Sequence, residues 1–201
     1  NRDSVSLVDT DGKGVERITE KGVVANGVEY EVDCIIFATG FEVGTGYTRR
    51  AGYNVIGREG VSLEEKWSDG MRTLHGIHTH GFPNLFIISN SQAGFTTNFP
   101  HAMDETAQHI GYILDQCKQD GIRAVEATKD AEDEWVEHII SVARFGADFQ
   151  EACTPGYYNN EGQPNPKSVQ NGPYGKGSRP YFRITKAWRE EGSMAGLSQT
   201  K

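Results

Sequence analysis

The sequence predicts an α/β fold, in which buried strands are combined with amphipathic helices. Three observations support this class: short β-rich runs over residues 5–42, two apolar runs typical of buried strands at 34–38 and 85–88, and two segments of helical period after residue 100. The 201 residues suffice for one domain or two small ones, and 36% hydrophobic with 24% charged residues is typical of a soluble globular protein.

The first predicted element is a β-meander over residues 5–32. Its β-rich runs alternate with turn signals, and the pair Asn26-Gly27 can supply the positive φ angles that a two-residue hairpin turn needs. The meander leads into the apolar run 34–38. We expect this run to be a strand buried on both faces, which stops at Thr39-Gly40.

The middle of the chain, residues 44–80, is rich in glycine and charge and shows no sustained period, so we expect loops with a short helix around residues 63–67. The turn over residues 81–84 then introduces the second buried strand at 85–88. The alternating histidines His75, His78 and His80 are interpreted as solvated or core side chains and not as a metal site, because no acidic residue or cysteine completes a ligand set nearby.

Two helices are predicted after residue 99. The first begins at Pro100 and ends at Gly121, with an apolar face at spacings of four and three formed by Met103, Ala107, Ile110, Leu114 and Cys117. The second is capped by Asp130 and ends at Gly146, with its apolar face formed by Ala131, Trp135, Ile139 and Ala143. The acidic run 130–137 is interpreted as a solvated helix face.

The composition shifts to Pro, Gly, Asn and Tyr beyond residue 153. Such a long irregular segment usually serves a site or an interface. We expect a short strand at 181–184 and a helix through Trp188 to anchor it.

Charge and composition disfavour several classes of partner. The net charge of −8, without a basic stripe, argues against nucleic acid, and no apolar run reaches the roughly 20 residues of a membrane span. Three widely spaced cysteines fit a reducing compartment, so we expect a cytoplasmic protein. The first residue, Asn1, already runs into a strand-like pattern, which suggests that the chain begins inside a larger protein.

The order of the motifs resembles the Baeyer–Villiger monooxygenases. The resemblance rests on the run that ends in Ala-Thr-Gly-Phe at 38–41, on 63–67, on 81–86, on 97–100 and on 133–138. It implies the C-terminal fragment of a flavoprotein with two dinucleotide-binding domains. Residues 1–42 would end the NADP-binding domain, 43–152 would be the C-terminal part of the FAD-binding domain, and 153–201 an irregular segment near the cofactor and substrate site.

The resemblance also implies contacts with FAD and NADPH. Asn98 and Phe99 would lie where the helix start faces the pyrimidine edge of the flavin, Phe99 through its backbone amide. Tyr157 falls where the family usually carries a Trp that contacts the nicotinamide cofactor. Independently of the family, a strand that ends at Thr39 and Gly40 lets a dinucleotide approach closely, because glycine has no Cβ.

The loop before this helix would border the ketone pocket by the same analogy, through Phe95 and Thr96. The competing interpretations are a plain surface loop at 95–96 and an ordinary loop-to-helix junction with Phe99 in the core. Ser89-Asn90-Ser91 departs from the Ala-Gly-Pro of many members, so no FAD contact is assigned to Asn90. No residue is assigned a catalytic or a metal-binding role.

The implied reaction inserts one oxygen atom of O2 next to a ketone carbonyl, with FAD and NADPH, to give an ester or lactone. The 201 residues contain no Gly-x-Gly-x-x-Gly phosphate-binding turn, so they would require the missing N-terminal part of the same enzyme and be inactive alone. Two alternatives stay open: an N-hydroxylating or sulfur-oxidising flavin-containing monooxygenase, and a stand-alone degenerate binding module without redox activity.

Overall fold

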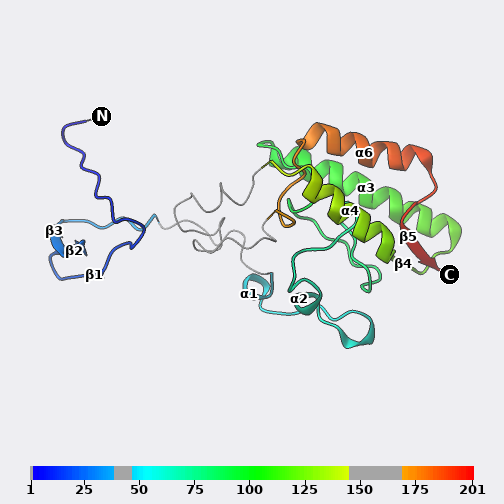
Figure 1. Ribbon diagram of the computed structural model, residues 1–201, viewed down its shortest axis with the longest axis horizontal. Helices are drawn as coiled ribbons and strands as arrows, with labels where there is room; N and C mark the ends of the chain where they lie inside the picture. The colour runs from blue at the N-terminus through cyan, green and yellow to red at the C-terminus, as the bar shows by residue number, and fades with distance from the viewer. Residues whose placement is uncertain (1, 39–46, 145–168) are drawn as a thin grey trace.

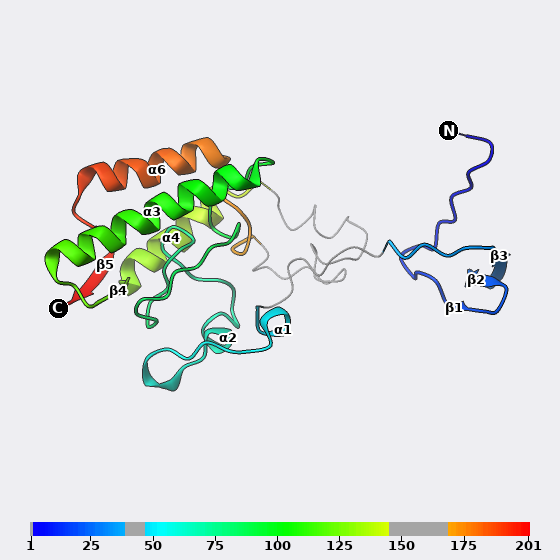
Figure 2. The ribbon, with the colours of Figure 1, turned by 180° about the vertical axis from the view of Figure 1, so that it is seen from behind.

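The computed structural model describes residues 2–38, 47–144 and 169–201 of the chain. Figure 1 and Figure 2 show it from opposite sides. The chain mixes helices and sheets, as the sequence predicts, although both described sheets are antiparallel. Among the described residues we find no helix with the length and apolar character of a membrane span.

The meander forms a three-stranded antiparallel sheet of β1 (Arg17–Ile18), β2 (Gly22–Ala25) and β3 (Val28–Glu31). Strands β2 and β3 are joined through Asn26 and Gly27, whose φ angles of 52° and 72° are those of the predicted turn. The prediction is confirmed from residue 17 onward, whereas residues 5–8 form no strand.

The apolar run 34–38 was expected to be a buried strand, and this expectation is wrong for the described structure. The run has no regular secondary structure, and Ile36 and Phe37 are strongly exposed. A strand needs a neighbour to pair its backbone N–H and C=O groups, and no described strand pairs with this run. Thr39 and Gly40 lie outside the described residues.

Residues 47–66 contain three short helices: α1 (Tyr47–Ala51), the 3-10 helix η1 (Arg58–Gly60) and α2 (Leu63–Lys66). The helix expected around 63–67 is therefore confirmed. It forms there because the Ser62 side chain accepts a hydrogen bond from the Glu65 amide at 3.1 Å and caps the first turn.

Residues 85–88 were also expected to form a buried strand, and this expectation is wrong. The segment has no regular secondary structure and belongs to neither sheet. Its Ile87 amide donates to the Ile77 carbonyl at 2.8 Å, while Ile88 is exposed. One such bond gives no ladder, so an apolar run alone was insufficient to specify a strand.

Helix α3 (Phe99–Asp120) begins and ends close to the predicted positions. Asn98 caps its start, and Gly121, with a φ of 67°, ends it in the left-handed conformation that favours glycine. The predicted apolar face is wrong at Ala107 and Leu114, which are exposed, whereas Cys117 is buried and Met103 packs partly buried against the core. The buried face is displaced by one residue, which turns it by about 100°, and consists of Ala102, Thr106, His109, Ile113 and Cys117.

Helix α4 (Lys129–Ser141) buries Trp135 and Ile139, as predicted. Its cap is Thr128 and not Asp130, because the Thr128 hydroxyl accepts from the Ala131 amide at 3.3 Å. The helix ends at Ser141, ahead of the predicted end at Gly146, which lies outside the described residues.

The C-terminal segment forms helix α6 (Ser178–Glu191) and strand β5 (Leu197–Thr200). The strand expected at 181–184 is thus wrong, because these residues lie inside α6. Strand β5 pairs antiparallel with β4 (Ala124–Ala127), a pairing that the sequence did not predict.

Helices α3, α4 and α6 lie side by side, with the β4–β5 pair at one end (Figures 1 and 2). The core between them includes aliphatic residues of α3 and α4 and aromatic residues of α4, α6 and the segment before α6. Its most buried members are Ala102, Ile113, Val125, Ala127, Ile139 and Tyr181, and Trp135 and Tyr174 also belong to it.

Candidate cofactor and substrate site

The start of α3 is exposed and leaves one backbone amide, that of Phe99, without an acceptor among the described residues. The Asn98 side chain accepts from the His101 amide at 3.3 Å, and position 100 is a proline without an N–H. No described residue accepts a hydrogen bond from the Phe99 amide. The first turn contains no acidic side chain. The positive end of this helix dipole is therefore available to an anionic ligand.

Two aromatic rings flank this helix start. Phe95 is 51% exposed and Phe99 is 47% exposed, so the interpretation that packed Phe99 in the core is wrong. Thr96 is half-buried, and its hydroxyl accepts from the Asn98 amide at 3.3 Å. The structure thus brings Phe95, Thr96, Asn98 and Phe99 together in one turn of chain.

The root of this loop is held by a group of side-chain amides, which we call the amide clamp: the buried Gln92 and Gln170 and the exposed Asn171. Gln92 Nε2 donates to the carbonyls of Met71 and Gln170 at 2.6 and 3.0 Å, and Gln170 Nε2 donates to Met71 at 2.6 Å. Asn171 Oδ1 accepts from the Met71 amide at 2.7 Å. Three segments far apart in sequence therefore meet at the loop root.

The next two residues of the loop are also fixed. The Ala93 carbonyl accepts from the Tyr174 amide at 2.9 Å. A Cβ on Gly94 would lie 2.6 Å from the Tyr181 ring and 2.9 Å from the Phe182 ring, so only glycine lets the backbone approach α6 this closely. Residues 92–94 are thus packed inside, whereas 95–99 project outward.

A cluster of histidines lies between α3, α6 and the turn at 74–78. His75 packs edge-on against Trp135, and its ring centroid is 5.5 Å from that of His109. Burial, with His78 as a second cause, lowers the pKa of His75 to about 3. Burial also lowers the pKa of His78 to about 4. The pKa of His109 falls to about 3, through burial first and then His75, Arg189 and His78.

These histidines are neutral at neutral pH, so they offer an anion no positive charge. The expectation of solvated or core side chains is confirmed: His75 and His78 are buried in the core, and His80 is exposed to solvent. We find no group of metal-ligating side chains within the described residues.

Glu132 in α4 is an acidic side chain that sequence reasoning placed at the surface. It is 1% exposed, and its carboxylate accepts from Lys66 Nζ, the Thr79 hydroxyl and the His80 amide, each at 2.8 Å. The expectation of a solvated acidic face is wrong at this position. Its donors all come from residues 66–80, far from α4 in sequence. The acidic run around Glu132 therefore gives no sign that this carboxylate is buried.

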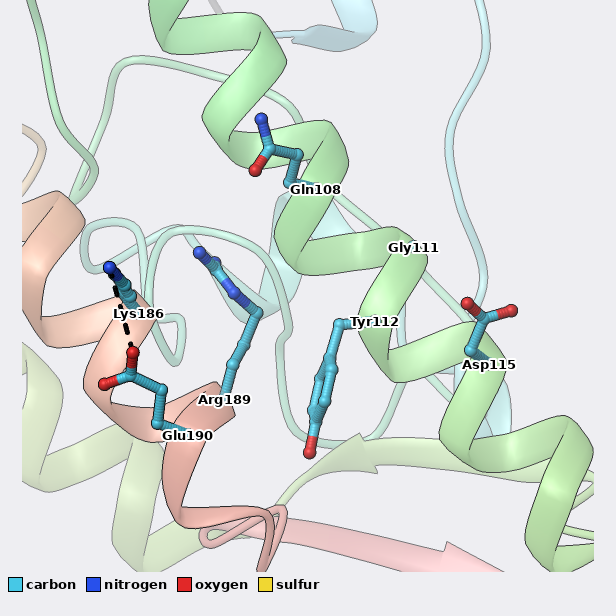
Figure 3. Close-up of a pocket in the computed structure, with 7 residues that line it drawn as sticks. All are labelled: Gln108, Gly111, Tyr112, Asp115, Lys186, Arg189 and Glu190. Atoms are coloured by element: carbon cyan, nitrogen blue, oxygen red, sulfur yellow. Dashed lines mark ion pairs between the residues drawn. The ribbon is translucent and has the colours of Figure 1, made fainter.

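A shallow groove of about 530 Å³ lies between α3 and α6 (Figure 3). Its lining mixes both signs of charge, and Lys186 pairs with Glu190 at 3.8 Å. Its α3 residues lie at least nine positions beyond Phe99, which is about 14 Å along the helix, so the groove is separate from the α3 start. The lining residues are Gln108, Gly111, Tyr112, Asp115, Lys186, Arg189 and Glu190.

The remaining predicted site residues cannot be placed. Thr39, Gly40 and Tyr157 lie outside the described residues, so their expected cofactor contacts stay predictions. Gln92 and Gly94 were not singled out by sequence reasoning. The positive φ of Gln92, 56°, is a property of the folded loop and leaves no local signal in the sequence.

No family model matches the chain. Among curated proteins, pentalenolactone D synthase of Streptomyces arenae is 51% identical over 199 residues, which are 98% of this chain and 34% of that protein. An FAD-binding monooxygenase of Hypomyces subiculosus is 44% identical over 100% of this chain and 33% of that protein. A Baeyer–Villiger monooxygenase of Stachybotrys chlorohalonatus is 40% identical over 98% of this chain and 32% of that protein.

The solved structures that match this chain are also monooxygenases of greater length. The polycyclic ketone monooxygenase of Thermothelomyces thermophila matches with a TM-score of 0.83 and 34% identity, over 97% of this chain and 32% of that one. An oxidised steroid monooxygenase bound to NADP matches with a TM-score of 0.79 and 26% identity, over 100% of this chain and 36% of that one. The chain therefore spans about a third of the length of the proteins it matches.

Proposed function

This chain is homologous over nearly its whole length to part of the Baeyer–Villiger monooxygenases, and on this premise we propose that it is the C-terminal part of an FAD- and NADPH-dependent enzyme of this kind. The whole enzyme would insert one oxygen atom of O2 next to a ketone carbonyl and form an ester or lactone. The cofactors supply the redox chemistry when bound. The described residues bind, orient and shield.

The observation that carries the proposal is the exposed start of α3 together with the outward half of its loop. An uncapped Phe99 amide, a helix of 22 residues behind it and the absence of acidic side chains in its first turn suit the electron-rich edge of a flavin. The amide would donate to that edge and the helix dipole would favour negative charge there.

Phe95 and Thr96 suit the ketone side of the same site. The half-exposed Phe95 ring offers apolar surface for the carbon skeleton of a ketone, which gains by leaving water. The Thr96 hydroxyl is held toward the Asn98 amide at 3.3 Å, which fixes the entry of the chain into α3. We assign both residues to the border of the substrate pocket.

The residues of this chain can provide only part of the binding sites for FAD and NADPH. The rest of the enzyme must supply the other part. The sequence lacks a Gly-x-Gly-x-x-Gly turn, so it offers no backbone cradle for a pyrophosphate. Phosphate binding for both FAD and NADPH belongs to a longer polypeptide. Thr39, Gly40 and Tyr157 remain proposed contacts from this chain to those cofactors.

The test is a substrate assay on the full-length, FAD-loaded enzyme. Cyclic and polycyclic ketones, amines and sulfides are each incubated with NADPH and O2, and esters, hydroxylamines and sulfoxides are quantified by mass spectrometry. We expect ester or lactone with consumption of NADPH, and none without NADPH. Oxidation of amines or sulfides with no ketone converted would overturn the proposal in favour of the N-hydroxylating or sulfur-oxidising alternative.

A further inference from the structure

We propose that Gln92 is a positioning residue that fixes where Phe95 and Thr96 stand in the ketone pocket. This inference rests on the proposed function for the identity of the pocket. Within the described residues, no hydrogen bond joins Gln92 to either of those side chains. It acts through the loop root, by tying the backbone that carries them to two remote segments and to α4.

Gln92 is fully buried, at 0% exposure, and every polar group it has is bonded. Its side chain donates to Met71 and Gln170, as described for the amide clamp. Its Oε1 accepts from the Thr73 hydroxyl at 2.5 Å. Its backbone amide donates to the Gly172 carbonyl at 2.8 Å, and its carbonyl accepts from Trp135 Nε1 at 3.2 Å.

The backbone of Gln92 has a φ of 56°, in the left-handed region that a glutamine seldom adopts. That conformation costs roughly 1 kcal/mol. A sharp local reversal of this kind persists when the surroundings fix it, and the five hydrogen bonds do so here. The reversal directs the chain from the buried clamp toward the exposed residues 95–99.

The chemistry of the contacts requires an amide. Two carbonyls face Nε2 and one hydroxyl faces Oε1, so the side chain must donate twice and accept once. A methionine matches the length and volume but supplies none of these bonds. A glutamate would set a carboxylate against two carbonyl oxygens.

Only two residues, Ala93 and Gly94, separate Gln92 from Phe95, and both are packed. Ala93 is bonded to Tyr174, and Gly94 lies against the Tyr181 and Phe182 rings. A displacement of the clamp therefore passes directly to Phe95 and Thr96. In a bound reactant pair, a misplacement of about 1 Å can lower the rate on the order of a hundredfold.

The experiment uses the full-length enzyme and an unsymmetrical ketone that gives two regioisomeric esters. Gln92→Met is compared with the wild type and with Gln199→Met, a matched change at an exposed position of β5. For Gln92→Met we expect kcat for ester formation to fall about tenfold or more, the ester formed per NADPH consumed to drop and the regioisomer ratio to change. Gln199→Met should match the wild type in all three.

A second pair of variants guards against loss of folding. Thr73→Val removes the hydroxyl that donates to Gln92, and Thr73→Ser keeps it. We expect the Val variant to move the regioisomer ratio in the direction of Gln92→Met, and the Ser variant to restore it. A purely stabilising role would lower the melting temperature and leave the ratio unmoved.

The outcomes separate the two proposals. If the wild type converts no ketone, the proposed function fails. If the wild type converts ketones and a folded Gln92→Met or Thr73→Val enzyme keeps the wild-type regioisomer ratio and NADPH coupling, the positioning role of Gln92 is wrong.

Discussion

Phe99 carries two separable contributions at the start of α3, a ring and a backbone amide. Phe99→Ala removes the ring alone, whereas Phe99→Pro removes both and still fits the first helical position, which tolerates proline. A hydrogen bond to a charged group contributes about 1.5–3 kcal/mol, so we expect ketone turnover by the Pro variant of the full-length enzyme to be at least about tenfold slower than by the Ala variant. Equal rates for the two variants would show that the amide is not used.

The buried histidines give a pH dependence of stability. Folding lowers the pKa of His75 and His109 to about 3 and of His78 to about 4, from an ordinary 6.5. The folded state therefore excludes a proton that the unfolded state binds. The stabilisation is complete above pH 6.5 and is lost as pH falls from 6.5 toward 3.

At pH 5 the lowered pKa of each histidine reduces the free energy of unfolding by about 2 kcal/mol relative to neutral pH. We expect the free energy of unfolding of the enzyme, measured with urea at pH 7.5 and pH 5, to fall by several kcal/mol. His109→Phe should reduce that fall by the share of one histidine, although His75, His78 and Arg189 still face the site. A free energy of unfolding that is the same at both pH values would contradict the prediction.

Among the candidate site residues, the sequence could predict those that lie at a helix start. Asn98 and Pro100 are local signals, and the structure confirms that a helix begins there. Gln92 could not be predicted, because its role depends on Met71, Thr73 and Gln170, which no local pattern connects to it. The role of Glu132 was missed for the same reason.

At the scale of elements, helix ends were predictable and helix faces were not. Gly121 ends α3 because glycine accepts the left-handed conformation, which is a property of one residue. The buried face depends on what packs against it. Thr106 and His109 are polar but lie inside, since Thr106 bonds to the Ala102 carbonyl at 2.9 Å and His109 packs against Trp188.

Strands were harder to predict, because each requires a partner elsewhere. The runs 34–38 and 85–88 have strand composition and no described ladder partner, whereas β4 and β5 pair although 69 residues lie between them. In α6, β-prone residues at 181–184 are helical between Gly177 and Gly192, which flank the element at both ends. Those two glycines at the helix ends indicate α6 better than the β-prone composition of residues 181–184 does.

Glu132 links α4 to the segment that contains α2. Glu132→Ala would leave the partly buried Lys66 and Arg72 without this carboxylate, and removing one partner of a buried ion pair costs about 3–5 kcal/mol. We expect a loss of this order in the free energy of unfolding of the full-length enzyme. Faster amide hydrogen exchange in α4 and residues 66–80 should accompany it.

The matched control is Glu137→Ala, in the same helix at an exposed position. It should change the free energy of unfolding by no more than about 0.5 kcal/mol. If both variants unfold at the same urea concentration, the Glu132 contacts do not hold these segments together.

At the scale of the whole molecule, the 201 residues lack a phosphate-binding turn and span about a third of their relatives. We expect a polypeptide of these residues alone to bind FAD weakly or not at all, because only one edge of the flavin would meet this chain. Flavin absorbance near 450 nm in the purified polypeptide measures this. A yellow product with one FAD per chain would contradict the prediction, and the full-length enzyme is the positive control.

The division of the pocket loop into a packed root at 92–94 and a projecting half at 95–99 has a consequence for protein engineering. The exposed Phe95 and the half-buried Thr96 lie outside the hydrophobic core, so their exchange should disturb it little, whereas a Cβ at Gly94 would collide with two rings of α6. Saturation libraries aimed at substrate scope should therefore retain most folded clones at 95 and 96 and few at 94. In this loop, the freedom to evolve new selectivity and the requirement to stay folded reside in adjacent residues.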